Sequence, residues 1–116
     1  MSIVRKHLSQ PWFDLIRTGR KTHEGRINEG FWKNLEVSDV FYFFNDENSF
    51  LVKVIEKILY PSFKDGIENL GLENVLPSCF DNKLTIDQSI DEVYYKYFSQ
   101  DQEIQHGIVF FKFDVL

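Results

Sequence analysis

The sequence predicts an α+β fold in one domain over residues 1–116. Residues 40–60 contain two aromatic and β-branched runs around the polar turn 45–48, which indicates a β-hairpin. Residues 107–116 carry an apolar side chain at every second position, as a strand does. Residues 85–98 repeat apolar side chains at three- and four-residue steps, which is typical of a helix. We therefore expect five strands interleaved with three helices.

The first elements are predicted from basic and turn-forming residues near the start of the chain. Residues 2–8 place apolar side chains among basic ones and favour a short strand. Pro11 fits the first turn of a following helix, since an N–H missing there costs little. Ser9 or Gln10 is its candidate cap, and Gly19 is expected to end it.

The later elements are predicted from the same periodicities and from the breaking residues between them. Thr85 and Gln88 have the spacing of a capping box at the start of the longest helix. The predicted elements are a strand ending near residue 27, a loop over 28–39 with one helical turn, strands over 40–44 and 50–60, a helix over 62–70, an irregular stretch over 72–84, a helix over 85–98 and a strand over 107–116.

Charge distribution limits the classes of partner. The net charge of −5 and the pI of about 5.1 argue against binding to a long phosphate backbone, so we do not expect duplex DNA as a partner. Residues 1–26 nevertheless carry six basic side chains against two acidic ones, whereas residues 65–103 are acidic. A basic pocket on an acidic protein suits a small anion or a few nucleotides.

Other composition features point to an intracellular, cytoplasmic protein without cofactors. No stretch has the roughly 18 apolar residues of a membrane span, and the N-terminus lacks a signal pattern. The single Cys79 cannot form an intramolecular disulfide, which fits a reducing compartment. His7, His23 and His106 lie far apart and have no ligand spacing, so we expect no metal site.

A charged cluster at the entry to the second strand is the main candidate site. A strand directs alternate residues to one face, so Glu24 and Arg26 share a face with Thr22 behind them, and Lys21 can join them from the turn. Lys21 can bind a phosphate or act as a base if burial lowers its pKa. Glu24 can accept hydrogen bonds from a base or ribose, act as general acid or base, or orient Arg26. A solvated surface ion pair is the alternative interpretation.

Aromatic side chains supply the other half of a candidate nucleobase site, because any base can stack on a flat ring. Trp32 lies in a polar loop, and Tyr95 lies off the apolar face of its predicted helix, so both are candidate ligand-binding residues. Trp12, Phe31 and Tyr94 are further candidates. For all five residues, core packing is the alternative role.

The pattern Gly19-x-Lys21-x-x-Glu24-x-Arg26 resembles the signature of the ASCH domain family, a relative of the PUA-like RNA-binding barrels. The Pro11-Trp12-Phe13 helix start and the 107–110 strand are similar as well. The periodicities alone fit an open sheet covered by helices almost as well as a small barrel. The resemblance implies a small PUA-like β-barrel of five to six mostly antiparallel strands with about three flanking helices. It also implies RNA contact in translation, RNA processing or cofactor regulation.

The resemblance leaves more than one function open. The first is binding of single-stranded RNA or a nucleotide through Lys21, Glu24 and Arg26. The second is catalysis, because some ASCH-like proteins hydrolyse N4-acylated cytidines and others are associated with RNA cleavage. The hydrolases use a Lys, a nucleophilic Thr and a Glu. Here Lys21 matches the Lys, and Glu24 occupies the Thr position. Thr22 is the candidate substitute for the nucleophile, and Glu73 is the candidate second carboxylate. The third is a protein-interaction module that uses the acidic 65–103 region, with partners that the sequence does not identify.

Overall fold

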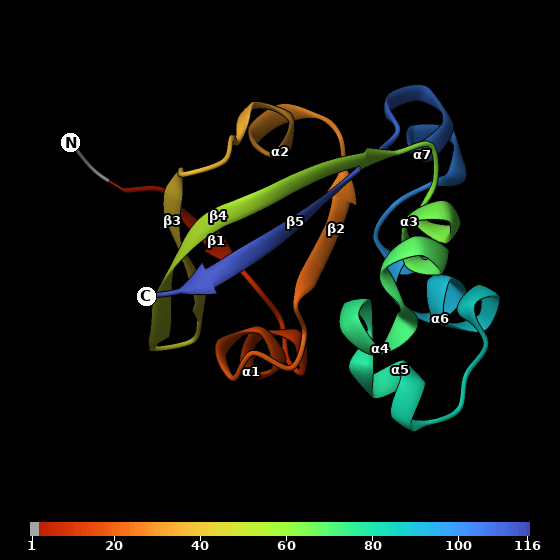
Figure 1. The fold of residues 1–116 in the computed structure, drawn as a ribbon, viewed down its shortest axis with the longest axis horizontal. Helices are drawn as coiled ribbons and strands as arrows, with labels where there is room; N and C mark the ends of the chain where they lie inside the picture. Colours follow the sequence, from red (N-terminus) through yellow and green to blue (C-terminus); the bar gives the residue numbers. More distant parts are fainter. Residues whose placement is uncertain (1–2) are drawn as a thin grey trace.

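The computed structural model describes residues 3–116, in which five strands form one mixed, curled sheet in the order β1-β3-β4-β5-β2 (Figure 1). β1 pairs with β3 in parallel, and the other neighbouring pairs are antiparallel. The sheet curls as a half-barrel, which confirms the α+β class and the mostly antiparallel, barrel-like sheet. The strands are β1 (Arg5–His7), β2 (His23–Ile27), β3 (Val40–Asn45), β4 (Asn48–Tyr60) and β5 (Ile108–Val115).

β4 and β5 form the centre of the sheet. β4 pairs with both β3 and β5, and its register against β5 shifts between Val54 and Glu56. Such a bulge bends the strand and increases its twist, which helps the sheet to curl. β5 contributes to two hydrophobic clusters, because Phe111 packs into one and Phe110 into the other. The predicted alternation of β5 is therefore confirmed, and its first half is buried on both faces.

Seven short α-helices and one 3-10 turn surround the sheet in the described part of the chain, where about three helices were expected. Figure 1 shows α3 to α7 together on the side of the sheet next to β2, apart from α1 and α2. The helical elements are α1 (Trp12–Arg17), α2 (Gly30–Asn34), α3 (Phe63–Leu70), α4 (Leu72–Val75), α5 (Pro77–Asp81), α6 (Ile86–Glu92), η1 (Tyr94–Lys96) and α7 (Gln100–His106).

The helical region between residues 61 and 106 differs from the prediction in three places. The stretch 72–84, expected to be irregular, contains α4 and α5, because Pro77 starts a new helix where a continuous one would break. The helix expected over 85–98 ends at Glu92, although its capping box is present. α7, which was not predicted, begins with a capping box of Ser99 and Gln102.

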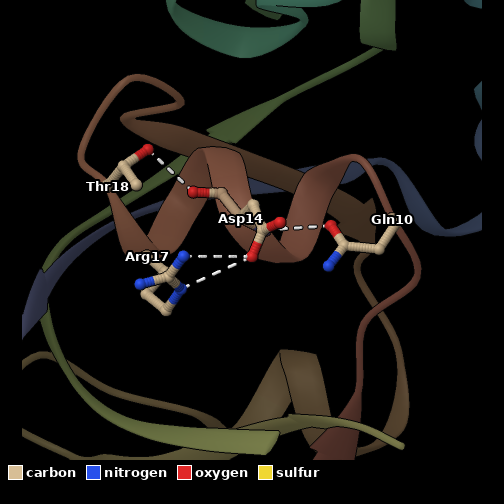
Figure 2. Close-up of polar contacts among 4 residues, drawn as sticks. All are labelled: Gln10, Asp14, Arg17 and Thr18. Carbon is tan, nitrogen blue, oxygen red and sulfur yellow. Dashed lines mark hydrogen bonds and ion pairs between the residues drawn. The ribbon is translucent and has the colours of Figure 1, made fainter.

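α1 lies over the sheet with a polar outer face (Figure 2). Pro11, and neither Ser9 nor Gln10, occupies the N-cap position, although the Gln10 side-chain carbonyl accepts a hydrogen bond from the Asp14 amide at 3.2 Å. The Asp14 carboxylate pairs with Arg17 at 3.3 Å, and its carbonyl accepts a hydrogen bond from the Thr18 hydroxyl. Phe13, on the opposite face, is buried in the core. The Leu15 carbonyl of α1 accepts a hydrogen bond from the Lys21 amide, so α1 holds the turn that leads into β2.

Within residues 3–116, no helix is both long enough and apolar enough to cross a membrane.

Candidate functional site

A cavity of about 310 Å³ lies beside the edge strand β2. Its walls come from the end of β1, from α1, from β2 and from the segment that follows α6. Trp12, Leu76, Tyr94 and Phe98 give it an apolar and aromatic lining. A cavity of this size is at the lower end of small-molecule sites, which run from about 300 to 1,000 Å³. It therefore suits one small ligand.

The cavity contains the three charged residues that the sequence singled out. The Glu24 side chain is only 7% exposed, and its Oε1 lies 3.8 Å from Lys21 Nζ. Its Oε2 lies 3.8 Å from a guanidinium nitrogen of Arg26. Both distances exceed the usual hydrogen-bond range, and Glu24 makes no side-chain hydrogen bond within the described residues. The two cations thus neutralise the carboxylate and leave its oxygens open to further donors.

Lys21 is held from two sides in the interior. Its side chain is 1% exposed, and Nζ donates a hydrogen bond to the carbonyl oxygen of Val75 at the end of α4. The ammonium also lies 5.3 Å from the centre of the Trp12 ring. Burial lowers the pKa of Lys21 from its ordinary value, Glu24 opposes this shift, and Arg26 adds to it. The Lys21 side chain is therefore fixed in place next to Glu24.

Arg26 is the most accessible of the three, with a side chain 21% exposed. Its guanidinium lies over the Trp32 ring at 4.6 Å, which is a cation–π distance. Trp32, in α2, also packs against Phe41 in the core. Trp32 thus contacts both Arg26 and the core, and it does not line the cavity. Arg26 is the cation best placed to meet a ligand that enters from solvent.

Three other candidate residues, Thr22, Glu73 and Tyr95, lie outside the cavity. The Thr22 hydroxyl is hydrogen-bonded to His23 Nδ1 at 2.8 Å, and Glu73 is exposed on α4. The Tyr95 hydroxyl donates a hydrogen bond to the buried Glu103 carboxylate at 2.7 Å. Burial, followed by Glu103, raises the pKa of Tyr95 to about 12. These three side chains are therefore directed to other neighbours.

Several cavity residues were not singled out from the sequence. Tyr94 was one of the aromatic candidates, whereas Tyr97 and Phe98 were not, although all three line the cavity. After α6 the backbone changes from an α-helix to the 3-10 turn η1, and Tyr94 of this turn lies close to Gly25 of β2. The capping box at Ser99 is the sequence signal for a new helix there, and it implies an earlier break.

A family model described as the ASCH domain matches residues 7–114. The chain belongs to the ASCH domain family. The resemblance carried by Lys21, Glu24 and Arg26 is thus confirmed over nearly the whole chain. No curated protein matches this chain.

Two solved structures resemble this ASCH domain along its full length. The crystal structure of the hypothetical protein PH0355 matches with a TM-score of 0.85 and 26% identity, covering 99% of this chain and 100% of that one. The solution NMR structure of protein PF0455 from Pyrococcus furiosus matches with a TM-score of 0.80 and 27% identity, covering 99% and 98%. The half-barrel with its flanking helices therefore recurs in these proteins.

A glycine within the ASCH signature stretch sets the spacing around the cavity. A Cβ atom at Gly25 would lie 2.7 Å from the ring of Phe110 and 3.2 Å from the Tyr94 hydroxyl oxygen. Real Cβ contacts are essentially never shorter than 3.0 Å. Gly25 therefore allows β2 to approach the core closely while Glu24 and Arg26 on either side face the cavity.

Proposed function

We propose that this ASCH domain binds one unpaired nucleotide in the cavity beside β2, either in single-stranded RNA or as a free mononucleotide. The observation that carries the proposal is the state of Glu24. Its carboxylate is buried between two cations, lines a cavity with aromatic walls, and accepts no hydrogen bond from the described residues. An intracellular role in RNA metabolism or translation is part of the proposal.

The chemistry of the cavity suits a nucleotide in three respects. Glu24 can accept hydrogen bonds from an amino or imino group of a base, and such bonds to a charged acceptor are strong. Trp12 and Phe98 offer ring faces for stacking. Arg26, exposed at the side, can meet a phosphate, while Lys21 keeps Glu24 charged and in position.

The proposal predicts a preference for short ligands. Arg26 is the only partly exposed cation among the three residues of the charged cluster, so few phosphates are engaged and affinity should fall with salt by only a few ion equivalents. We expect mononucleotides or short single-stranded RNA to bind better than duplex DNA in titration calorimetry at several salt concentrations. A steep salt slope or a preference for duplex DNA would contradict the proposal.

Two arginine variants provide the matched comparison for this titration. Arg26→Ala removes the guanidinium over Trp32 and should weaken binding of each nucleotide. Arg17→Ala removes an exposed arginine on α1 whose partner is Asp14, outside the cavity. The Arg17 variant should bind like the wild type. Equal losses in both variants would indicate a general charge effect on the surface and not a site at β2.

Hydrolysis is the second candidate function, and one observation favours it. Lys21 is fully enclosed next to Glu24, and burial lowers its pKa, which is how proteins prepare a lysine for proton transfer. Lys21, Glu24 and Arg26 would serve an RNA cleavage reaction as acid or base and charge-stabilising cations. A route through a threonine nucleophile has less support, because the Thr22 hydroxyl is bonded to His23 and lies outside the cavity.

A further inference from the structure

The Tyr94 hydroxyl is buried without a partner. Tyr94 is 4% exposed, and its ring stacks on Phe63 with ring centres 4.0 Å apart and planes within 9°. The hydroxyl oxygen forms no hydrogen bond within the described residues, although Tyr94 lines the cavity. A buried polar group without a partner costs free energy, and native proteins retain few of them. The stacked ring alone would be served equally well by phenylalanine.

The nearest neighbour of this hydroxyl on β2 is Gly25, and the phenol keeps its proton. A Cβ atom at Gly25 would lie 3.2 Å from the Tyr94 oxygen, so the glycine lets the backbone of β2 pass close to the hydroxyl with no side chain between them. The Gly25 amide opposes the rise in the pKa of Tyr94 but lies outside hydrogen-bond geometry. Burial and then Glu24 raise that pKa well above its ordinary value, so the phenol keeps its proton. The group can therefore both donate and accept a hydrogen bond.

We propose that the Tyr94 hydroxyl is a base-reading group of the cavity. It hydrogen-bonds a carbonyl oxygen or ring nitrogen of a nucleobase whose neighbouring amino or imino hydrogen is bonded to Glu24. This inference rests on the proposed function and deepens it, since it assigns the inner end of the cavity to the base. A neutral phenol and a carboxylate that line the same cavity can match the donor–acceptor edge of a heterocycle. The phosphate then lies towards Arg26.

The test is Tyr94→Phe, which removes the hydroxyl and keeps the ring on Phe63. Titration calorimetry with the four ribonucleoside 5′-monophosphates first identifies the tightest binder. We expect Tyr94→Phe to weaken that binder about fivefold, the effect of one neutral hydrogen bond. Ribose 5-phosphate, which lacks the base, should bind more weakly and equally to both proteins. The unfolding temperature without ligand should be unchanged or higher, because an unpartnered buried hydroxyl is lost.

Tyr60→Phe is the matched control. The Tyr60 hydroxyl accepts a hydrogen bond from the Asn69 side chain, and Tyr60 does not line the cavity. This variant should leave nucleotide affinity unchanged and should lower stability or leave it as it is.

The outcomes separate the two proposals. If Tyr94→Phe binds every monophosphate like the wild type while Arg26→Ala weakens binding, the base-reading role is overturned and the proposed function stands. The base-reading role also falls if ribose 5-phosphate binds as tightly as the monophosphates or loses the same factor in Tyr94→Phe. If the wild type binds neither monophosphates nor short RNA, both proposals are overturned.

Discussion

Replacing Lys21 by methionine is expected to destabilise the folded protein by about 3 kcal/mol, because it leaves a charge in the interior without its nearest partner. The Glu24 carboxylate would keep only Arg26, and the Val75 carbonyl would lose its donor. Denaturant unfolding monitored by circular dichroism gives the free energy of unfolding. A loss below 1 kcal/mol would show that Lys21 behaves like a surface lysine, and the enclosed charge cluster would be rejected.

A double variant tests whether the destabilisation comes from the unpaired charge of Glu24. Lys21→Met combined with Glu24→Leu removes both buried charges, so it should unfold at higher denaturant than Lys21→Met alone. Asp14→Ala provides the exposed comparison, since its pair with Arg17 is open to solvent on both sides. Such a pair contributes about 1 kcal/mol or less.

Glu24→Gln is expected to reduce nucleotide affinity by about 1–2 kcal/mol, because a charged acceptor of a hydrogen bond becomes neutral. The shape of the side chain and its ability to form hydrogen bonds are kept. The loss corresponds to about five- to thirtyfold in the dissociation constant. Calorimetry with the tightest-binding monophosphate measures it directly.

The same variant distinguishes binding from catalysis. A binding domain should turn over neither a short RNA nor N4-acetylcytidine in the wild type. If the wild type does turn over one of them, a general acid or base at Glu24 requires a rate loss of about 100-fold or more in Glu24→Gln with binding nearly intact. Turnover that Glu24→Gln retains in full would remove Glu24 from the chemistry and make Thr22 the residue to test.

The features that the sequence predicts well depend on local patterns. Alternation along residues 107–116 and the polar turn at 45–48 correspond to β5 and the β3–β4 hairpin. The period-two geometry of β2 places Glu24 and Arg26 on one face, as expected. Each of these features depends on the directions of nearby side chains in a strand, which a short sequence window contains.

The features that were missed depend on contacts between distant segments. A lysine in a turn gives no sign that Val75, on a helix 54 residues later, will accept its hydrogen bond. The ligand-binding roles expected for Trp32 and Tyr95 could not be judged from the sequence for the same reason. Trp32 contacts Arg26 and Tyr95 contacts Glu103 only in the folded chain. The break after α6 likewise follows from tertiary packing, which overrides a continuous helical pattern.

A crystal structure of the protein with its tightest-binding monophosphate tests the central claim most directly. We expect the base inside the cavity beside β2, with a donor atom within about 3.2 Å of a Glu24 carboxylate oxygen and with the phosphate on the Arg26 side. A nucleotide on another face of the sheet, with Glu24 contacted only by Lys21 and Arg26, would contradict the account.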